Sequence, residues 1–217
     1  MGIIESFGEN GNYVDEIFPP VISSLFSYAG RKKNKLPEFK WKRIGEVFPE
    51  SQLVMWSSDL SKISVEASTN LASDYFVLGL NCIKSSKTLL RFMFESQQPN
   101  PQGIYYVKLF QGNMWKFVLI DDHIPIIEEI KHNKKTGETY KEIRPAFLTV
   151  NSSHSNSVLS TSSNSQKSPE VVDIWPFLIE KAFAKIYSSY EALQHGNIFD
   201  FIEELTNKPY EFISLEE

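Results

Sequence analysis

The sequence predicts an α+β fold, because two helical patterns flank a pair of alternating runs that are typical of a β-hairpin. The stronger helical pattern lies over 175–193, where apolar residues recur in steps of three and four and form one stripe. The members of this stripe are Trp175, Leu178, Ala182, Ile186, Tyr190 and Leu193. The other helical pattern begins near Asn70, and the alternating runs cover 103–120. A chain of 217 residues is long enough to bury a sizeable core in one or two domains.

Composition and charge exclude several classes of protein. Hydrophobic residues make up 41% of the chain and aromatic residues 13%, which is typical of a globular protein. The net charge of −5 offers no broad basic face for phosphates, so we expect no nucleic-acid partner. Cys82 is the single cysteine, which excludes an intrachain disulfide and favours a reducing compartment, the cytoplasm.

Residues 1–12 contain glycine and asparagine and are predicted to be a flexible N-terminus. The start, from Met1 to Ser6, fits the pattern for N-myristoylation, with Gly2 as the acceptor. The pattern is short, and no cysteine or polybasic run follows directly to add a second membrane signal. Two interpretations stay open: an acylated Gly2 that makes the protein a peripheral membrane adaptor, or an ordinary flexible start. No stretch approaches the roughly 20 apolar residues of a membrane span, and no secretory signal is present.

The helix predicted from Asn70 has its apolar side at Leu71, Tyr75, Leu78, Cys82 and Leu89 or Leu90. Cys82 is then a small buried hydrophobic residue. Asp74 lies near the helix start, where a carboxylate is favoured by the helix dipole.

The hairpin is predicted from the runs 103–110 and 114–120, which Gln111-Gly112-Asn113 separates. The stretch 151–168, between Lys131 and Glu170, is mostly Ser and Asn. This composition has little to bury, so a disordered surface insertion is predicted at about 131–170. The helix over 175–193 then begins with Pro176, which a first helical turn tolerates, preceded by the acidic Asp173.

The residue identities in the helix over 175–193 carry more information than their periodicity. The run Trp-Pro-x-Leu-x-Glu-Lys-Ala-aromatic-Ala-Lys-Ile from Trp175, followed by Ser-Tyr-Glu-Ala-Leu, resembles the central helix of calpain protease cores. The segment Tyr13–Phe26, the Trp-Lys-Arg at Trp41 and the hairpin ending in Asp121-Asp122-x-x-Pro resemble the same family. The resemblance covers most of 13–217. It implies the first, nucleophile-bearing lobe of a papain-like, two-lobed calpain catalytic core, truncated before the second lobe.

Calpains use a cysteine, a histidine and an asparagine, and the resemblance implies that the cysteine position is lost here. The nucleophile motif is Gln-Gly-x-Leu-Gly-Asp-Cys-Trp-aromatic-Leu-Ala, and 68–78 is the matching stretch. Asp74 falls at the nucleophile, Ser68 at the glutamine of the oxyanion hole and Tyr75 at the tryptophan. The family histidine and asparagine come from the second lobe. None of the four histidines here matches a catalytic position; they are His123, His132, His154 and His195.

The resemblance therefore implies a non-catalytic, calpain-like pseudoprotease lobe with a binding or scaffold role toward an unidentified protein partner. The alternative is a fragment of a calcium-dependent cysteine endopeptidase whose His/Asn lobe is encoded elsewhere. A membrane adaptor anchored through Gly2 is the third interpretation. In calpains the surface around the nucleophile faces a cleft, so Asp74, Tyr75 and Trp175 are expected at the surface.

Calcium is the other chemistry of the family, whose first lobe binds one ion through backbone carbonyls and acidic side chains. The acid before the aromatic-Trp pair matches Asp173. The second acid falls on Val65, or is displaced to Asp59 or Glu66. Because Ca²⁺ takes several charged oxygens, two interpretations of Asp173 stay open: a calcium ligand or a first-turn helix acid. No other cofactor is expected.

Overall fold

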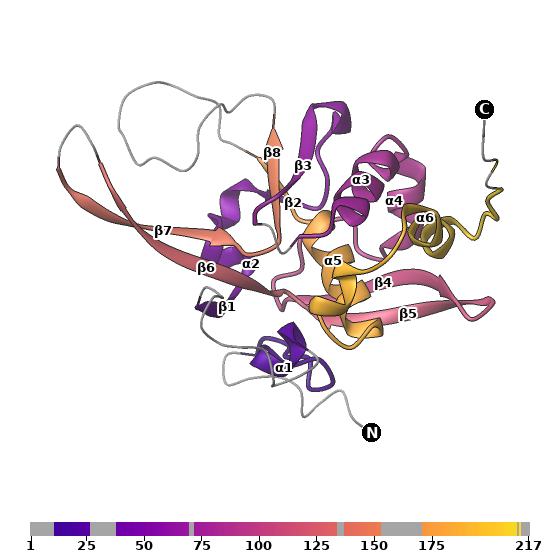
Figure 1. Cartoon of the computed structure of the whole chain (residues 1–217), viewed down its shortest axis with the longest axis horizontal. Helices are drawn as coiled ribbons and strands as arrows, with labels where there is room; N and C mark the ends of the chain where they lie inside the picture. The colour runs from indigo at the N-terminus through magenta and orange to yellow at the C-terminus, as the bar shows by residue number, and fades with distance from the viewer. Residues whose placement is uncertain are drawn as a thin grey trace.

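The computed structural model describes residues 11–26, 38–69, 72–133, 137–152, 171–211 and 213. They form a mixed α+β fold, as predicted, with short helices around small sheets (Figure 1). The helices are α1 (Ile22–Leu25), α2 (Ile44–Val47), α3 (Asp74–Ile83), α4 (Lys87–Met93), α5 (Trp175–Ile186) and α6 (Ile198–Thr206). Three 3₁₀ turns are η3 (Glu50–Gln52), η4 (Leu60–Lys62) and η5 (Glu191–Gln194).

The strands form one three-stranded sheet and three pairs, mostly antiparallel. The three-stranded sheet has the order β1 (Phe39–Arg43), β6 (His123–His132), β7 (Thr139–Pro145). The pairs are β2 (Leu53–Val54) with β9 (Val172–Asp173), β3 (Ile63–Ala67) with β8 (Leu148–Ser152), and β4 (Ile104–Gln111) with β5 (Met114–Asp121). The pair β2–β9 is parallel. Within the described residues, no helix combines the length and the apolar character that crossing a bilayer requires.

Helix α5 lies at the centre of the fold, between the β4–β5 hairpin and the other sheets (Figure 1). Pro176 is in its first turn, as predicted, and every side chain from Trp175 to Ala184 is buried. The predicted single stripe over 175–193 is therefore wrong in two respects. The helix is buried on all sides, and it ends at Ile186, after which Ser188 takes a left-handed conformation (φ 74°). A buried helix needs no polar face, which is why a stripe understated its burial.

Helix α3 exposes a different face from the one predicted. Its buried positions are Phe76, Gly79, Leu80 and Ile83, whereas Leu78 is 55% exposed. Cys82 is also exposed, so the prediction that it is a buried hydrophobic residue was wrong. The reason lies at Gly79, where a Cβ atom would come within 2.2 Å of the Phe201 ring of α6. The missing side chain lets α6 pack against this face and no other.

The predicted hairpin is confirmed as β4–β5, in the register that joins Gln111 to Met114. Gly112 (φ 61°) and Asn113 (φ 60°) both have positive φ, as the central residues of a type I′ turn require. Glycine and asparagine adopt this conformation readily, so local chemistry determines the turn. The inner face of the hairpin packs into the core through Val107 and Ile120, which are fully buried.

The N-terminal part of the disordered insertion predicted at about 131–170 is structured. Strand β6 continues to His132, and β7 and β8 are paired strands inside the predicted range. β7 pairs with β6 through residues such as Glu142, which is buried, so this part is structured. Residues 134–136 and 153–170 lie outside the described residues, as do 1–10, and the disorder predicted for them stays a prediction.

Candidate functional site

The start of α3 is where the calpain motif places the nucleophile. Asp74 is the first residue of the helix and is exposed. Ser73 precedes it with an extended backbone and makes no capping hydrogen bond. A carboxylate here faces the positive end of the helix dipole, which stabilises it. The local arrangement therefore suits a charged group at a helix start.

Ser68, at the position of the oxyanion glutamine, is held by the turn that joins β7 to β8. Its hydroxyl donates to the carbonyl of Pro145 (2.5 Å), and its backbone N–H donates to the carbonyl of Phe147 (2.8 Å). The Arg144 guanidinium donates to the Ser68 carbonyl and hydroxyl oxygens. All these contacts attach the chain before α3 to the β7–β8 turn, which is a structural role.

The cysteine and the histidines considered for catalysis lie apart from one another. Cys82 is the penultimate residue of α3, about two turns from Asp74. Of the histidines, His123 starts β6, His132 ends β6, and His195 follows η5. Within the described residues, no hydrogen bond joins Cys82 to a histidine, and His154 lies outside them. The expectation that Trp175 is at the surface was wrong, because this side chain is fully buried.

Asp173 lies at the end of β9, buried just before α5. One of its carboxylate oxygens accepts the Ser57 backbone N–H (2.6 Å), and the other accepts the Ser57 hydroxyl. Burial raises the pKa of Asp173, and the hydrogen bonds from Ser57 oppose this increase. The carboxylate thus ties the loop after β2 to the start of α5.

The other two acids considered for calcium do not join Asp173. Asp59 accepts the Ser61 N–H at the start of η4, and Glu66 is exposed on β3. Val65 is buried. Within the described ranges, no group of three or more His, Cys, Asp or Glu side chains gathers to hold a metal ion. Asp173 therefore stands alone at this position, and both of its carboxylate oxygens accept hydrogen bonds from Ser57. Since Ca²⁺ takes several charged oxygens, these side chains do not fit a Ca²⁺ site.

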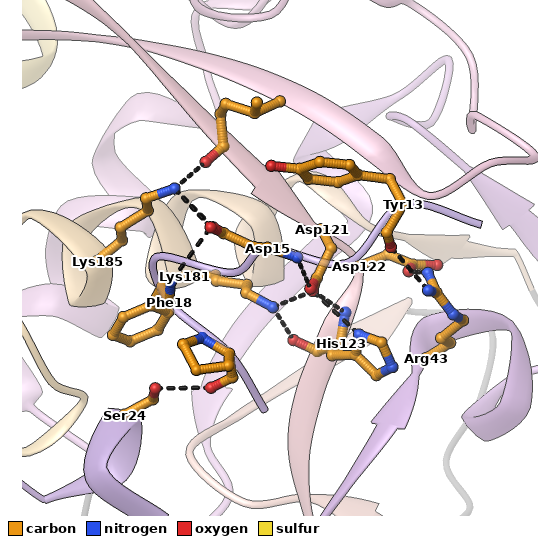
Figure 2. Close-up of polar contacts among 12 residues, drawn as sticks. Tyr13, Asp15, Phe18, Ser24, Arg43, Asp121, Asp122, His123, Lys181 and Lys185 are labelled. Carbon is orange, nitrogen blue, oxygen red and sulfur yellow. Dashed lines mark hydrogen bonds and ion pairs between the residues drawn. The ribbon is translucent and has the colours of Figure 1, made fainter. Parts of the chain in front are cut away.

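The densest polar cluster is a buried ion-pair network between α5, the hairpin and the N-terminal segment (Figure 2). Lys181 is fully buried on α5 and forms an ion pair with Asp121, the last residue of β5. Its ammonium also donates to the carbonyl of His123 (2.7 Å). The Asp121 carboxylate accepts backbone N–H bonds from Asp15 and His123, each 2.8 Å. Three donors therefore converge on one buried carboxylate, and the Nδ1 atom of the His123 ring lies 3.2 Å from it.

A second ion pair completes the network one helical turn further along α5. Lys185 contacts both carboxylate oxygens of Asp15 (2.8 and 2.7 Å) and donates to the Leu119 carbonyl (2.6 Å). Arg43 pairs with Asp122 and donates to the Tyr13 carbonyl (2.7 Å), as Figure 2 shows. The network therefore attaches the segment from Tyr13 to the core.

Sequence reasoning noted the Asp121-Asp122 pair only as part of a family motif and missed this network. The two lysines, four residues apart on α5, gave no signal by themselves, because only the structure shows that the helix around them is buried. Burial alone would raise the pKa of Asp121, but the His123 hydrogen bond and the Lys181 charge together lower it well below its ordinary value.

Glu180, next to Lys181, is buried and has no such partner. Burial raises the pKa of Glu180 well above its ordinary value, because it disfavours the charged form of the carboxyl group in the native state. The unfolded chain ionises this group near its ordinary pKa of about 4.3. The contribution of Glu180 to stability is therefore full below that pH and is lost as the pH rises through the folded-state pKa.

The variant Glu180→Gln should be more stable than the wild type at pH 7.5, by about 1–3 kcal/mol in the free energy of unfolding. At pH 3 the two proteins should differ less, because the Glu180 carboxyl group is then mostly protonated in both the folded and the unfolded state. Urea unfolding followed by circular dichroism measures both values. Glu66→Gln, at an exposed position, is the control and should change little. An equal effect of Glu180→Gln at both pH values would contradict the assignment.

Comparison with known proteins covers nearly all of this structure. Residues 13–217 match the family described as calpain family cysteine protease. The calpain-1 catalytic subunit of Bos taurus is 28% identical over 205 residues, which are 93% of this chain and 24% of that protein. The calpain-1 catalytic subunit of Homo sapiens is 27% identical over the same shares. The chain thus spans about a quarter of the length of these relatives. Since the match includes the ion-pair network, the hairpin and both central helices, the chain belongs to the calpain family of cysteine proteases.

Proposed function

We propose that this chain is a calpain-like lobe that carries out no cysteine-protease chemistry itself and acts by binding a protein partner. The observation that carries the proposal is the separation of the single thiol from the start of α3. Asp74 occupies that start, whereas Cys82 lies near the other end of the helix. A cysteine nucleophile needs the thiolate, which a helix N-terminus or a neighbouring cation favours, and an adjacent base.

Neither Asp74 nor Cys82 replaces the missing cysteine nucleophile and its base. A carboxylate such as Asp74 serves as a nucleophile in glycoside and phosphoryl chemistry, but attack on a peptide would produce an anhydride and needs strong activation. Cys82 is exposed near the end of α3, and within the described residues it makes no hydrogen bond to a histidine. Binding is the role left to a lobe that keeps the family architecture without a positioned nucleophile.

A second candidate follows from the family itself. The chain matches about a quarter of the calpain-1 catalytic subunits, and the alternative proposal is that it is a part of a larger calcium-dependent cysteine endopeptidase. In that case another segment or chain supplies the histidine and the asparagine. A cytoplasmic location and a membrane contact through an acylated Gly2 are further proposals that rest on the sequence alone.

The protein should not cleave casein in the presence of calcium, because no thiolate is positioned at the start of α3. Incubation with casein and calcium, with and without a thiol-directed peptide inhibitor, measures this. Calpain-1 serves as the positive control. Calcium-dependent cleavage that the inhibitor blocks would contradict the proposal.

The variant Asp74→Cys distinguishes the two candidates. A restored cysteine should leave this chain inactive, because the histidine base and its asparagine are still absent from the site. Cleavage by the variant would show that a base is in place and would favour the endopeptidase. The variant Cys82→Ser controls for the native thiol and should behave like the wild type.

A further inference from the structure

A partly open pocket of about 180 Å³ lies where α5, α6 and the start of α3 meet. Its walls include four aromatic rings and two acids, namely Tyr75, Phe183, Tyr187, Phe201, Asp200 and Glu204. The rings come from α3, from α5 and its C-cap, and from α6, and α3 is far from the other two in the sequence, so the pocket exists only in the folded lobe. It adjoins the start of α3, since Tyr75 directly follows Asp74.

The aromatic rings are fixed by their packing. Phe201 contacts Phe183 (4.9 Å between centroids) and lies edge-to-face with Tyr75 (6.4 Å). Gly196 lies under the Tyr75 ring, where an added Cβ would come within 2.5 Å of it. The rings therefore form preorganised walls, which lowers the entropic cost of binding.

The two acids occupy neighbouring turns of α6 and make the pocket electronegative. Tyr187 donates its hydroxyl to Glu204, and Asp200 accepts from Asn197 and Tyr210. Burial and the nearby Asp200 and Glu203 raise the pKa of Glu204, with the Tyr187 hydrogen bond opposing them. Of the described residues that line the pocket, none is Lys or Arg, and His195 is the one basic side chain. The part of the chain that the structure describes thus supplies no lysine or arginine to these carboxylates.

We propose that this pocket binds a lysine side chain of a peptide segment in the protein partner. The lysine ammonium would pair with Glu204 and Asp200 through charge-assisted hydrogen bonds, and the rings would add cation–π attraction. The size agrees, because an engineered cavity of about 150 Å³ binds benzene, which has six heavy atoms, and a lysine side chain has five. The proposal rests on the binding role proposed above and names the chemistry of the partner.

Binding of short peptides to the full chain tests the proposal. The probe is acetyl-Gly-Gly-Lys-Gly-Gly-amide, compared with the same peptide carrying norleucine, which keeps the alkyl stem without the charge. Nuclear magnetic resonance titration should show saturable binding of the lysine peptide, and about tenfold weaker or no binding of the norleucine peptide. Equal binding of the two would overturn the proposal.

Variants on α6 locate the site. Glu204→Gln should weaken binding of the lysine peptide at least fivefold, whereas Glu203→Gln, one residue earlier and outside the pocket lining, should not. Circular dichroism checks that each variant is folded, and Asp200→Asn replaces Glu204→Gln if the latter is not. Equal weakening by the variants at 203 and 204 would overturn the proposal that lysine binds in this pocket.

The outcomes for this pocket and for the proposed function are separate. Cleavage of casein together with selective lysine binding would overturn the non-catalytic function and support the pocket. Absence of both cleavage and lysine binding would overturn the proposed lysine binding and leave the non-catalytic function standing.

Discussion

Replacing Lys181 with methionine should lower the free energy of unfolding by about 3–5 kcal/mol, because it leaves the Asp121 carboxylate buried without its cation. Both side chains are fully buried, so water cannot replace the missing charge. Methionine keeps most of the length and apolar character of the lysine stem, which limits the effect of lost packing. Urea unfolding followed by tryptophan fluorescence measures the change.

The pH dependence of this loss follows from the lowered pKa of Asp121. A carboxylate with a lowered folded-state pKa contributes stability above its unfolded pKa of about 3.9, and the contribution is lost as the pH falls toward the folded value. The gap between wild type and Lys181→Met should therefore be full at pH 7 and narrow below pH 4. A gap that stays constant to pH 2 would contradict the role of the ion pair.

The surface pair Lys141–Glu128 is the matched control for the buried pair. Its nitrogen and oxygen are 2.7 Å apart, but the Lys141 side chain is 56% exposed. Lys141→Met should cost at most about 1 kcal/mol, since solvent screens the exposed pair. A loss as large as that of Lys181→Met would mean that the effect does not depend on burial.

The variant Leu178→Ala should cost about 2–5 kcal/mol, because it leaves a cavity in the centre of the core. Leu178 is fully buried on α5, the helix that contacts the hairpin and β8. Leu78→Ala makes the same chemical change on α3, where the side chain is 55% exposed. This control should stay within about 0.5 kcal/mol of the wild type.

The two leucine variants also test which face of α3 is buried. Periodicity in the sequence placed Leu78 on the core side, whereas the structure has it toward solvent. Thermal and urea unfolding of both variants give the two values. Comparable losses would mean that Leu78 is packed, and would support the face predicted from the sequence.

Local chemistry in the sequence was sufficient for the hairpin and for the start of α5, whereas α3, predicted from Asn70, begins at Asp74. Gly112 and Asn113 accept positive φ, Pro176 suits a first turn, and Asp74 suits a helix start. Each of these features depends on residues that are adjacent in the chain. The family was recognisable for a similar reason, because runs of matching residues need no knowledge of contacts.

Only the tertiary structure decided which faces are buried and which charges meet. Nearly every position of α3 is apolar, so its sequence allowed two buried faces, and the contact of Gly79 with Phe201 selected one. Asp121 and Lys181 are 60 residues apart, and Asp15 and Lys185 are 170 apart. Periodicity describes one element at a time and carries no information about such partners. The buried ion pairs and the pocket at α6 arise where distant elements pack, and the sequence alone therefore did not predict them.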